Sequence, residues 1–115
     1  MKIMRIVIIG LVLMGLCSSA MAHPPKDVEL SFNDATKVLM IHVSHAVGNI
    51  EKHFIDRVIV KLNKKIVVDQ AFDVQDTNEG QSFQYEIPQA KLGDKIIVKA
   101  ACNVFGKKKG AIIVE

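Results

Sequence analysis

Three residues with metal-binding side chains stand where expected strands end: His45, His53 and Cys102. His45 and His53 bracket one loop, 46–52, and Cys102 ends a later apolar segment. Strand ends from distant parts of a chain meet at one rim of a β-sandwich. Because imidazole and thiolate together suit iron, copper or zinc, the three residues predict a metal site at that rim. The alternative is two solvated loop histidines and one buried cysteine, since free cysteine often packs as a small hydrophobe.

The remaining histidines lead to different predictions. His42 has the opposite strand parity to His45, so a regular strand cannot aim both at one ion, and His42 is predicted at the surface. Ser44 also points away from His45, which disfavours a serine hydrolase. His23 follows an expected cleavage point, and as a free amino terminus it would offer copper its amine and ring nitrogen; the alternative is a frayed terminus. Pro24 has no N–H, so it blocks copper chelation through the second backbone nitrogen.

The start of the chain has the pattern of a secretory signal. Lys2 and Arg5 lie at the start of the chain, Ile6–Leu16 is apolar, and Ala20-Met21-Ala22 has the small-x-small form that a signal peptidase needs. The apolar stretch is far shorter than the ~20 residues of a membrane-spanning helix. We therefore expect a cleavable signal peptide over 1–22 and a periplasmic or secreted domain over 23–115 with no membrane contact. A retained membrane anchor is the alternative.

Removal of the signal changes the charge and the cysteine content. It takes two of the 15 basic residues and none of the 12 acidic residues, which leaves a net charge of +1. No basic patch is expected, so nucleic acid is not predicted as a partner. Cys17 leaves with the signal, so Cys102 has no partner for an intramolecular disulfide. A lone thiol in an oxidising compartment is reactive unless it is buried or held by a metal as thiolate.

Short alternating segments between turn signals predict an all-β fold, an immunoglobulin-like β-sandwich of about seven strands. The expected strands are 28–32, 38–44, 54–62, 65–72, 83–87, 95–103 and 111–114. Asn63-Lys64 predicts a tight hairpin turn, because Asn tolerates positive φ. The run Lys107–Lys109 predicts a solvated turn, because like charges repel one another. No stretch of residues 23–115 shows sustained helical periodicity.

Three segments of the sequence resemble the iron-binding domain of the desulfoferrodoxin and superoxide reductase (neelaredoxin) family. They are Val43-Ser44-His45, Glu51-Lys52-His53-Phe54-Ile55 and Cys102-Asn103-Val104-Phe105-Gly106. The resemblance implies an immunoglobulin-like sandwich that binds iron through His45, His53 and Cys102, with Cys102 as the axial, electron-donating ligand. It implies a redox partner protein, and Lys52 would be the nearest basic group for attracting superoxide.

The ligand set is shorter than that of the family. Phe105 stands where the family has its last histidine ligand, and the family's early ligand segment has no clear match. The resemblance therefore predicts an iron-binding redox protein and leaves superoxide reduction open. Copper, or no metal, is the alternative cofactor assignment.

A second resemblance carries a different prediction. The segments His53-Phe54-Ile55, Leu62-Asn63-Lys64-Lys65 and Gly93-Asp94-Lys95-Ile96-Ile97-Val98 look like the small sandwich subunit of the periplasmic sulfur-oxidation carrier complex. That resemblance implies a non-enzymatic module that docks a partner protein and holds no metal. Cys102-Asn103 favours the iron family, because the carrier subunit typically has an aspartate there. An open strand edge would also allow a homodimer.

Overall fold

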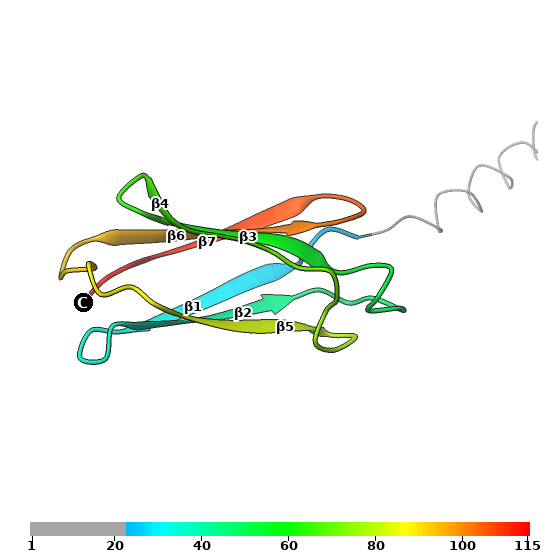
Figure 1. Ribbon diagram of the computed structural model, residues 1–115, viewed down its shortest axis with the longest axis horizontal. Coiled ribbons are helices and arrows are strands. Elements are labelled where there is room, and N and C mark those ends of the chain that lie inside the picture. The colour runs from blue at the N-terminus through cyan, green and yellow to red at the C-terminus, as the bar shows by residue number, and fades with distance from the viewer. Residues whose placement is uncertain (1–22) are drawn as a thin grey trace, which may run out of the picture.

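Two antiparallel sheets face each other in this protein, whose computed structural model describes residues 23–115 (Figure 1). The first sheet has the order β1 (Asp27–Asn33), β2 (Val38–Ser44), β5 (Gly80–Glu86). The second sheet has the order β4 (Lys65–Ala71), β3 (Ile55–Leu62), β6 (Lys95–Cys102), β7 (Lys107–Ile113). These seven strands confirm the predicted all-β immunoglobulin-like sandwich. The predicted signal peptide, 1–22, lies outside the described residues.

The core lies between the sheets and follows the alternation of side chains along each strand. On β2, Leu39, Ile41 and Val43 are buried, whereas Met40 and His42 face solvent. Strands β3 and β6 supply the opposite wall through their own buried alternate positions, which are Val58, Val60, Ile96, Val98 and Ala100. Burial of each large aliphatic side chain contributes about 1.5–3 kcal/mol to folding. No helix in residues 23–115 is long and apolar enough to cross a membrane.

The β3–β4 hairpin confirms the predicted turn at Asn63-Lys64. Both residues have positive φ, 49° at Asn63 and 79° at Lys64. Two successive positive φ values are the signature of a type I′ turn, whose twist matches that of the flanking strands. The Asn63 side chain also donates to the Asp94 carboxylate at 2.8 Å, which ties this hairpin to the turn before β6.

The predicted turn over Lys107–Lys109 is wrong, because these residues form the first half of β7. They pair with β6, with Lys109 opposite Lys99. The turn comes earlier and ends at Gly106, whose φ is +81°. A lysine run suits an exposed edge strand, since the backbone pairs while the ammonium groups stay in water. Gly110 lies within the strand, where a Cβ atom would sit 2.6 Å from the Val28 carbonyl oxygen of β1.

Strand β5 also begins earlier than expected, at Gly80 instead of Phe83. Gly80 pairs with Ser44 of β2, and a side chain at Gly80 would clash with the Val43 carbonyl oxygen. The glycine therefore marks a close approach of two backbones and not a loop. This start brings the loop before β5 against the end of β2, where His45 lies.

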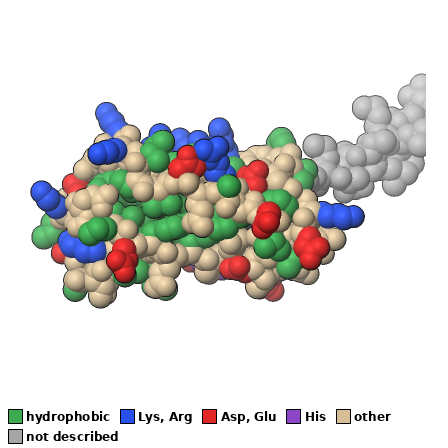
Figure 2. Space-filling model, in the orientation of Figure 1, with side chains coloured by type: hydrophobic (Ala, Val, Ile, Leu, Met, Phe, Trp, Pro, Cys, Tyr) green, Lys and Arg blue, Asp and Glu red, His purple; other side chains and the backbone are tan. Residues whose placement is uncertain are grey.

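A basic patch does form, contrary to the expectation from net charge. From Arg57 onward the odd-numbered positions of β3 face outward, as do those of β6, and the register aligns them with β7. The outer surface of the second sheet thereby gathers five basic residues, here called the basic face: Arg57, Lys61, Lys99, Lys107 and Lys109. Figure 2 shows Lys and Arg side chains along the upper edge of the molecule, over this sheet. The sequence does not reveal the basic face, because its five residues come from three different strands.

Candidate metal centre

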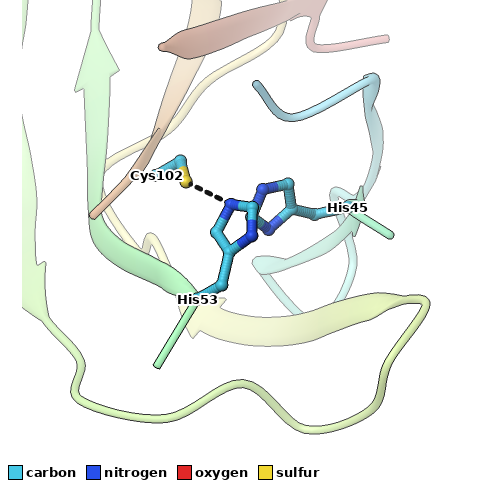
Figure 3. Close-up of side chains that lie close together, drawn as sticks. All are labelled: His45, His53 and Cys102. Carbon is cyan, nitrogen blue, oxygen red and sulfur yellow. Dashed lines mark hydrogen bonds between the residues drawn. The ribbon is translucent and has the colours of Figure 1, made fainter. Parts of the chain in front are cut away.

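The three side chains predicted to form a metal site do lie together (Figure 3). His45 follows the end of β2, His53 precedes β3, and Cys102 is the last residue of β6. Their potential ligand atoms all lie within 4.8 Å of one another. The first sheet supplies His45 and the second sheet supplies the other two, so the cluster bridges both layers at one rim of the sandwich.

His53 and Cys102 form the closest pair in the cluster. The His53 Nε2 atom lies 3.0 Å from Cys102 Sγ, and the Val104 N–H donates to the same sulfur at 3.4 Å. The pairing of Ile55 with Cys102 between β3 and β6 sets this approach. Cys102 is 9% exposed, so its sulfur is shielded from solvent yet has two nitrogen neighbours. Such an arrangement suits a sulfur that acts as an acceptor or as a metal ligand.

Asn103 fixes the loop that carries His53. Its Oδ1 atom accepts the Phe54 N–H at 2.9 Å, and its Nδ2 donates to the Lys52 carbonyl oxygen at 2.9 Å. Its backbone N–H donates to the Phe54 carbonyl oxygen at 3.1 Å. These contacts hold both neighbours of His53 against the residue that follows Cys102. The sequence placed Asn103 in a motif without assigning it this positioning role.

His45 is held by Gln75, a residue that the sequence did not single out. Both side chains are 1% exposed. The Gln75 Nε2 group donates to the His45 and Thr77 carbonyl oxygens, each at 2.8 Å. Its Oε1 must therefore be the atom 2.8 Å from His45 Nδ1, so that nitrogen carries the hydrogen. A glutamine in a polar loop gives no local signal of such a role.

The other ring nitrogen of His45 has an unusual neighbour. Its Nε2 atom lies 3.2 Å from the His23 carbonyl oxygen. Because Nδ1 carries the hydrogen, neutral His45 presents a lone pair to another acceptor. A second proton or a cation would resolve this contact. Metal–ligand bonds of about 2.0–2.2 Å at tetrahedral angles would place two such ligands roughly 3.3–3.6 Å apart, near the observed distance.

Burial and neighbouring charge favour the neutral form of His53. Desolvation, followed by the proximity of His45 and His23, lowers the pKa of His53 below its ordinary value of 6.5. The His23 backbone acts in the opposite direction. The His45 and His53 rings meet edge to face, with centroids 4.7 Å apart and planes at 87°. A neutral imidazole is the form that binds a metal ion.

The cluster fits a metal ion after a small adjustment. Four-coordinate sites with bonds of about 2.0–2.3 Å place tetrahedral ligands roughly 3.3–3.8 Å apart. The separations here reach 4.8 Å, so a side-chain movement of about 1 Å would close the set. Two imidazoles and one thiolate suit iron, copper or zinc.

Two other residues lie outside the cluster. His42 is exposed on β2 and its Nδ1 contacts Ser82 Oγ at 2.9 Å, which confirms its predicted surface position. Phe105 lies in the turn between β6 and β7 and is 54% exposed. A phenylalanine offers no donor atom, so the ligand position that the family resemblance places at Phe105 supplies nothing here.

Comparison with protein-family models and with curated protein sequences finds no match to this chain. Fold and site therefore define the class of protein: an immunoglobulin-like sandwich with a His/His/Cys cluster across one rim. The desulfoferrodoxin resemblance contributes predictions about the metal and its use.

Proposed function

We propose that this chain is an exported redox protein that binds iron through His45, His53 and Cys102. The observation that carries the proposal is the approach of His45 Nε2 to the His23 carbonyl oxygen at 3.2 Å, beside a His53–Cys102 contact of 3.0 Å. Each feature alone has a structural explanation, such as a protonated ring or a simple hydrogen bond. A single cation at the rim would satisfy both.

Different residues of the chain would have different roles at this site. Cys102 would donate electron density through its sulfur, and Gln75 holds His45 with Nε2 free as a ligand. Bound iron would supply one-electron chemistry. The family resemblance suggests superoxide as the electron acceptor. The exposed Lys52, which precedes His53 in the chain, would be the basic group that attracts that anion.

Metal analysis tests the proposal most directly. Protein isolated from the periplasm, or purified and given Fe²⁺ without oxygen, is expected to hold about one iron per chain, as one three-ligand cluster allows. A thiolate charge-transfer absorption is expected, and Cys102→Ser should abolish it. Native protein that carries copper or zinc would keep the site and change its metal. Protein that takes up no metal under any of these conditions would refute the proposal.

We also propose a second function, docking of an acidic partner protein on the basic face. The charge of Lys107 is the largest cause of the lowered pKa of Lys99, followed by desolvation and then by the charges of Lys109 and Lys61. Lys61, Lys99 and Lys109 also line a shallow hollow of about 60 Å³ with two isoleucines. An acidic surface would relieve this repulsion and gain electrostatic complementarity.

Poly-glutamate is a suitable probe for this second function. The double variant Lys99→Gln/Lys109→Gln is expected to weaken binding at low salt at least about tenfold. The matched control Lys26→Gln/Lys91→Gln removes the same charge from exposed sites outside the basic face. Equal losses in the two variants would show that net charge alone, and not the basic face, attracts the polymer.

A further inference from the structure

The segment 23–26 is fastened to the rim that holds the cluster. Pro25 is buried, and the Lys26 N–H donates to the Ser44 carbonyl oxygen at 2.8 Å. Pro24 packs directly on Gly106, where any side chain would collide with the proline ring. Figure 1 shows this segment running beside the turn between β6 and β7. The backbone of His23 is thereby fixed between the end of β2 and the turn that follows Cys102.

This placement sets which part of His23 meets the cluster. Its carbonyl oxygen lies 3.2 Å from His45 Nε2, whereas its side chain is exposed. An open hollow of about 450 Å³ adjoins both residues, and Lys26 and Glu79 also line it. The α-nitrogen of His23 is two bonds from its carbonyl carbon, and a residue before proline favours an extended ψ, which turns this nitrogen to the same side as the carbonyl oxygen so that both can chelate one ion.

We propose that cleavage of the Ala22–His23 bond completes the metal site, because the new α-amine and the carbonyl oxygen of His23 chelate the ion. This inference rests on the iron site proposed above and adds its regulation. Hydrolysis of the bond by a signal peptidase consumes one water, leaves a carboxylate on Ala22 and an amine on His23. The three side chains then gain two backbone ligands, and the site binds its ion tightly only after export.

The chemistry of the nitrogen explains why cleavage matters. In the precursor the His23 nitrogen is an amide, whose lone pair is delocalised into the peptide bond. The freed amine has a reference pKa of about 7.7–8.0, so it loses its proton readily to bind a metal. Amine nitrogen, α-carbon, carbonyl carbon, oxygen and metal close a five-membered ring. Pro24 has no N–H, so the next backbone nitrogen cannot replace the oxygen.

Three proteins test this inference with Fe²⁺ added anaerobically and bound iron measured by equilibrium dialysis. The first begins at His23 and the second begins at Ala20, which keeps three natural residues before His23. The third begins at position 23 with His23→Ala, which keeps the amine and the carbonyl but loses the ring. The first is expected to bind iron about 10–100-fold more tightly than the second, and the third to stay within about threefold of the first.

The possible outcomes distinguish the backbone chelate of His23 from the proposed iron site. Equal affinity of the first two proteins, with binding lost in Cys102→Ser, would overturn the chelate and leave the iron site standing. Loss of affinity in the His23→Ala protein equal to that of the extended protein would assign the ligand to the ring and also overturn the backbone chelate. Absence of iron from all three would refute the iron site and the chelate together.

Discussion

The Nε2 atom of His53 lies 3.0 Å from the sulfur of Cys102, although 49 positions separate the two residues in the chain. The contact depends on the pairing of β3 with β6, which sets Ile55 opposite Cys102. An unfolded chain has no such pair. Any ion that binds there binds the folded state selectively and must stabilise it.

Metal binding should therefore raise the free energy of unfolding. At an iron concentration of 100 times Kd, the expected gain is about 2.7 kcal/mol. Anaerobic denaturant titration with and without Fe²⁺ measures it. Cys102→Ser should lose this gain, whereas His42→Ala removes an exposed histidine from the opposite face and should keep it. A gain that survives in Cys102→Ser would place the ion elsewhere.

Replacement of Gln75 by alanine should damage both stability and metal affinity. The change leaves the His45 and Thr77 carbonyl oxygens without their donor and frees the His45 ring. We expect a loss of about 2–4 kcal/mol in the free energy of unfolding, because buried unsatisfied groups are costly. Iron affinity should fall about 10–100-fold.

The matched control for that change is Gln84→Ala on the exposed side of β5. It should shift unfolding by no more than about 0.5 kcal/mol. Denaturant titration and iron dialysis on both variants provide the comparison. If Gln75→Ala binds iron as tightly as the parent protein, the amide has no role in orienting His45.

The turn before β6 should make the thermal stability of the protein fall as the pH becomes acidic. Hydrogen bonds from Asn63 and from the Lys91 N–H lower the pKa of Asp94 below its ordinary value of 3.8. A carboxylate with a lowered folded pKa stabilises the protein above the unfolded pKa and loses that effect as pH falls through the folded pKa. Asp94→Asn should therefore flatten the decline in thermal stability below about pH 4. The exposed Asp76→Asn is the control and should leave the decline unchanged.

The basic face should lower stability at neutral pH. Repulsion from Lys107, desolvation and further lysines lower the pKa of Lys99 below 10.5. A base with a lowered folded pKa destabilises the protein below that pKa, and the penalty disappears as pH rises through it toward the unfolded value. Lys99→Gln should thus raise Tm at pH 7 and low salt, and the difference should shrink in high salt. Lys26→Gln, outside the basic face, should not raise Tm.

The sequence by itself determined the strand pattern and the reactive residues. Alternation along Val38–Ser44 defined the buried side of β2, and Asn63-Lys64 defined a hairpin, because both are local consequences of side-chain period and backbone sterics. The placement of His45, His53 and Cys102 at strand ends also followed from local pattern. Their convergence needed only the general rule that strand ends share a rim.

The tertiary structure decided what depends on distant neighbours. Lys107–Lys109 became a strand because β6 offered its backbone groups for pairing, a contact that a run of like charges does not reveal. Gln75 contacts His45, although 30 positions separate them in the chain. Pro24 packs on Gly106, and this contact places the His23 carbonyl oxygen beside the same ring. Local propensity carries no information about such long-range contacts, because they form only when the two sheets close on one another.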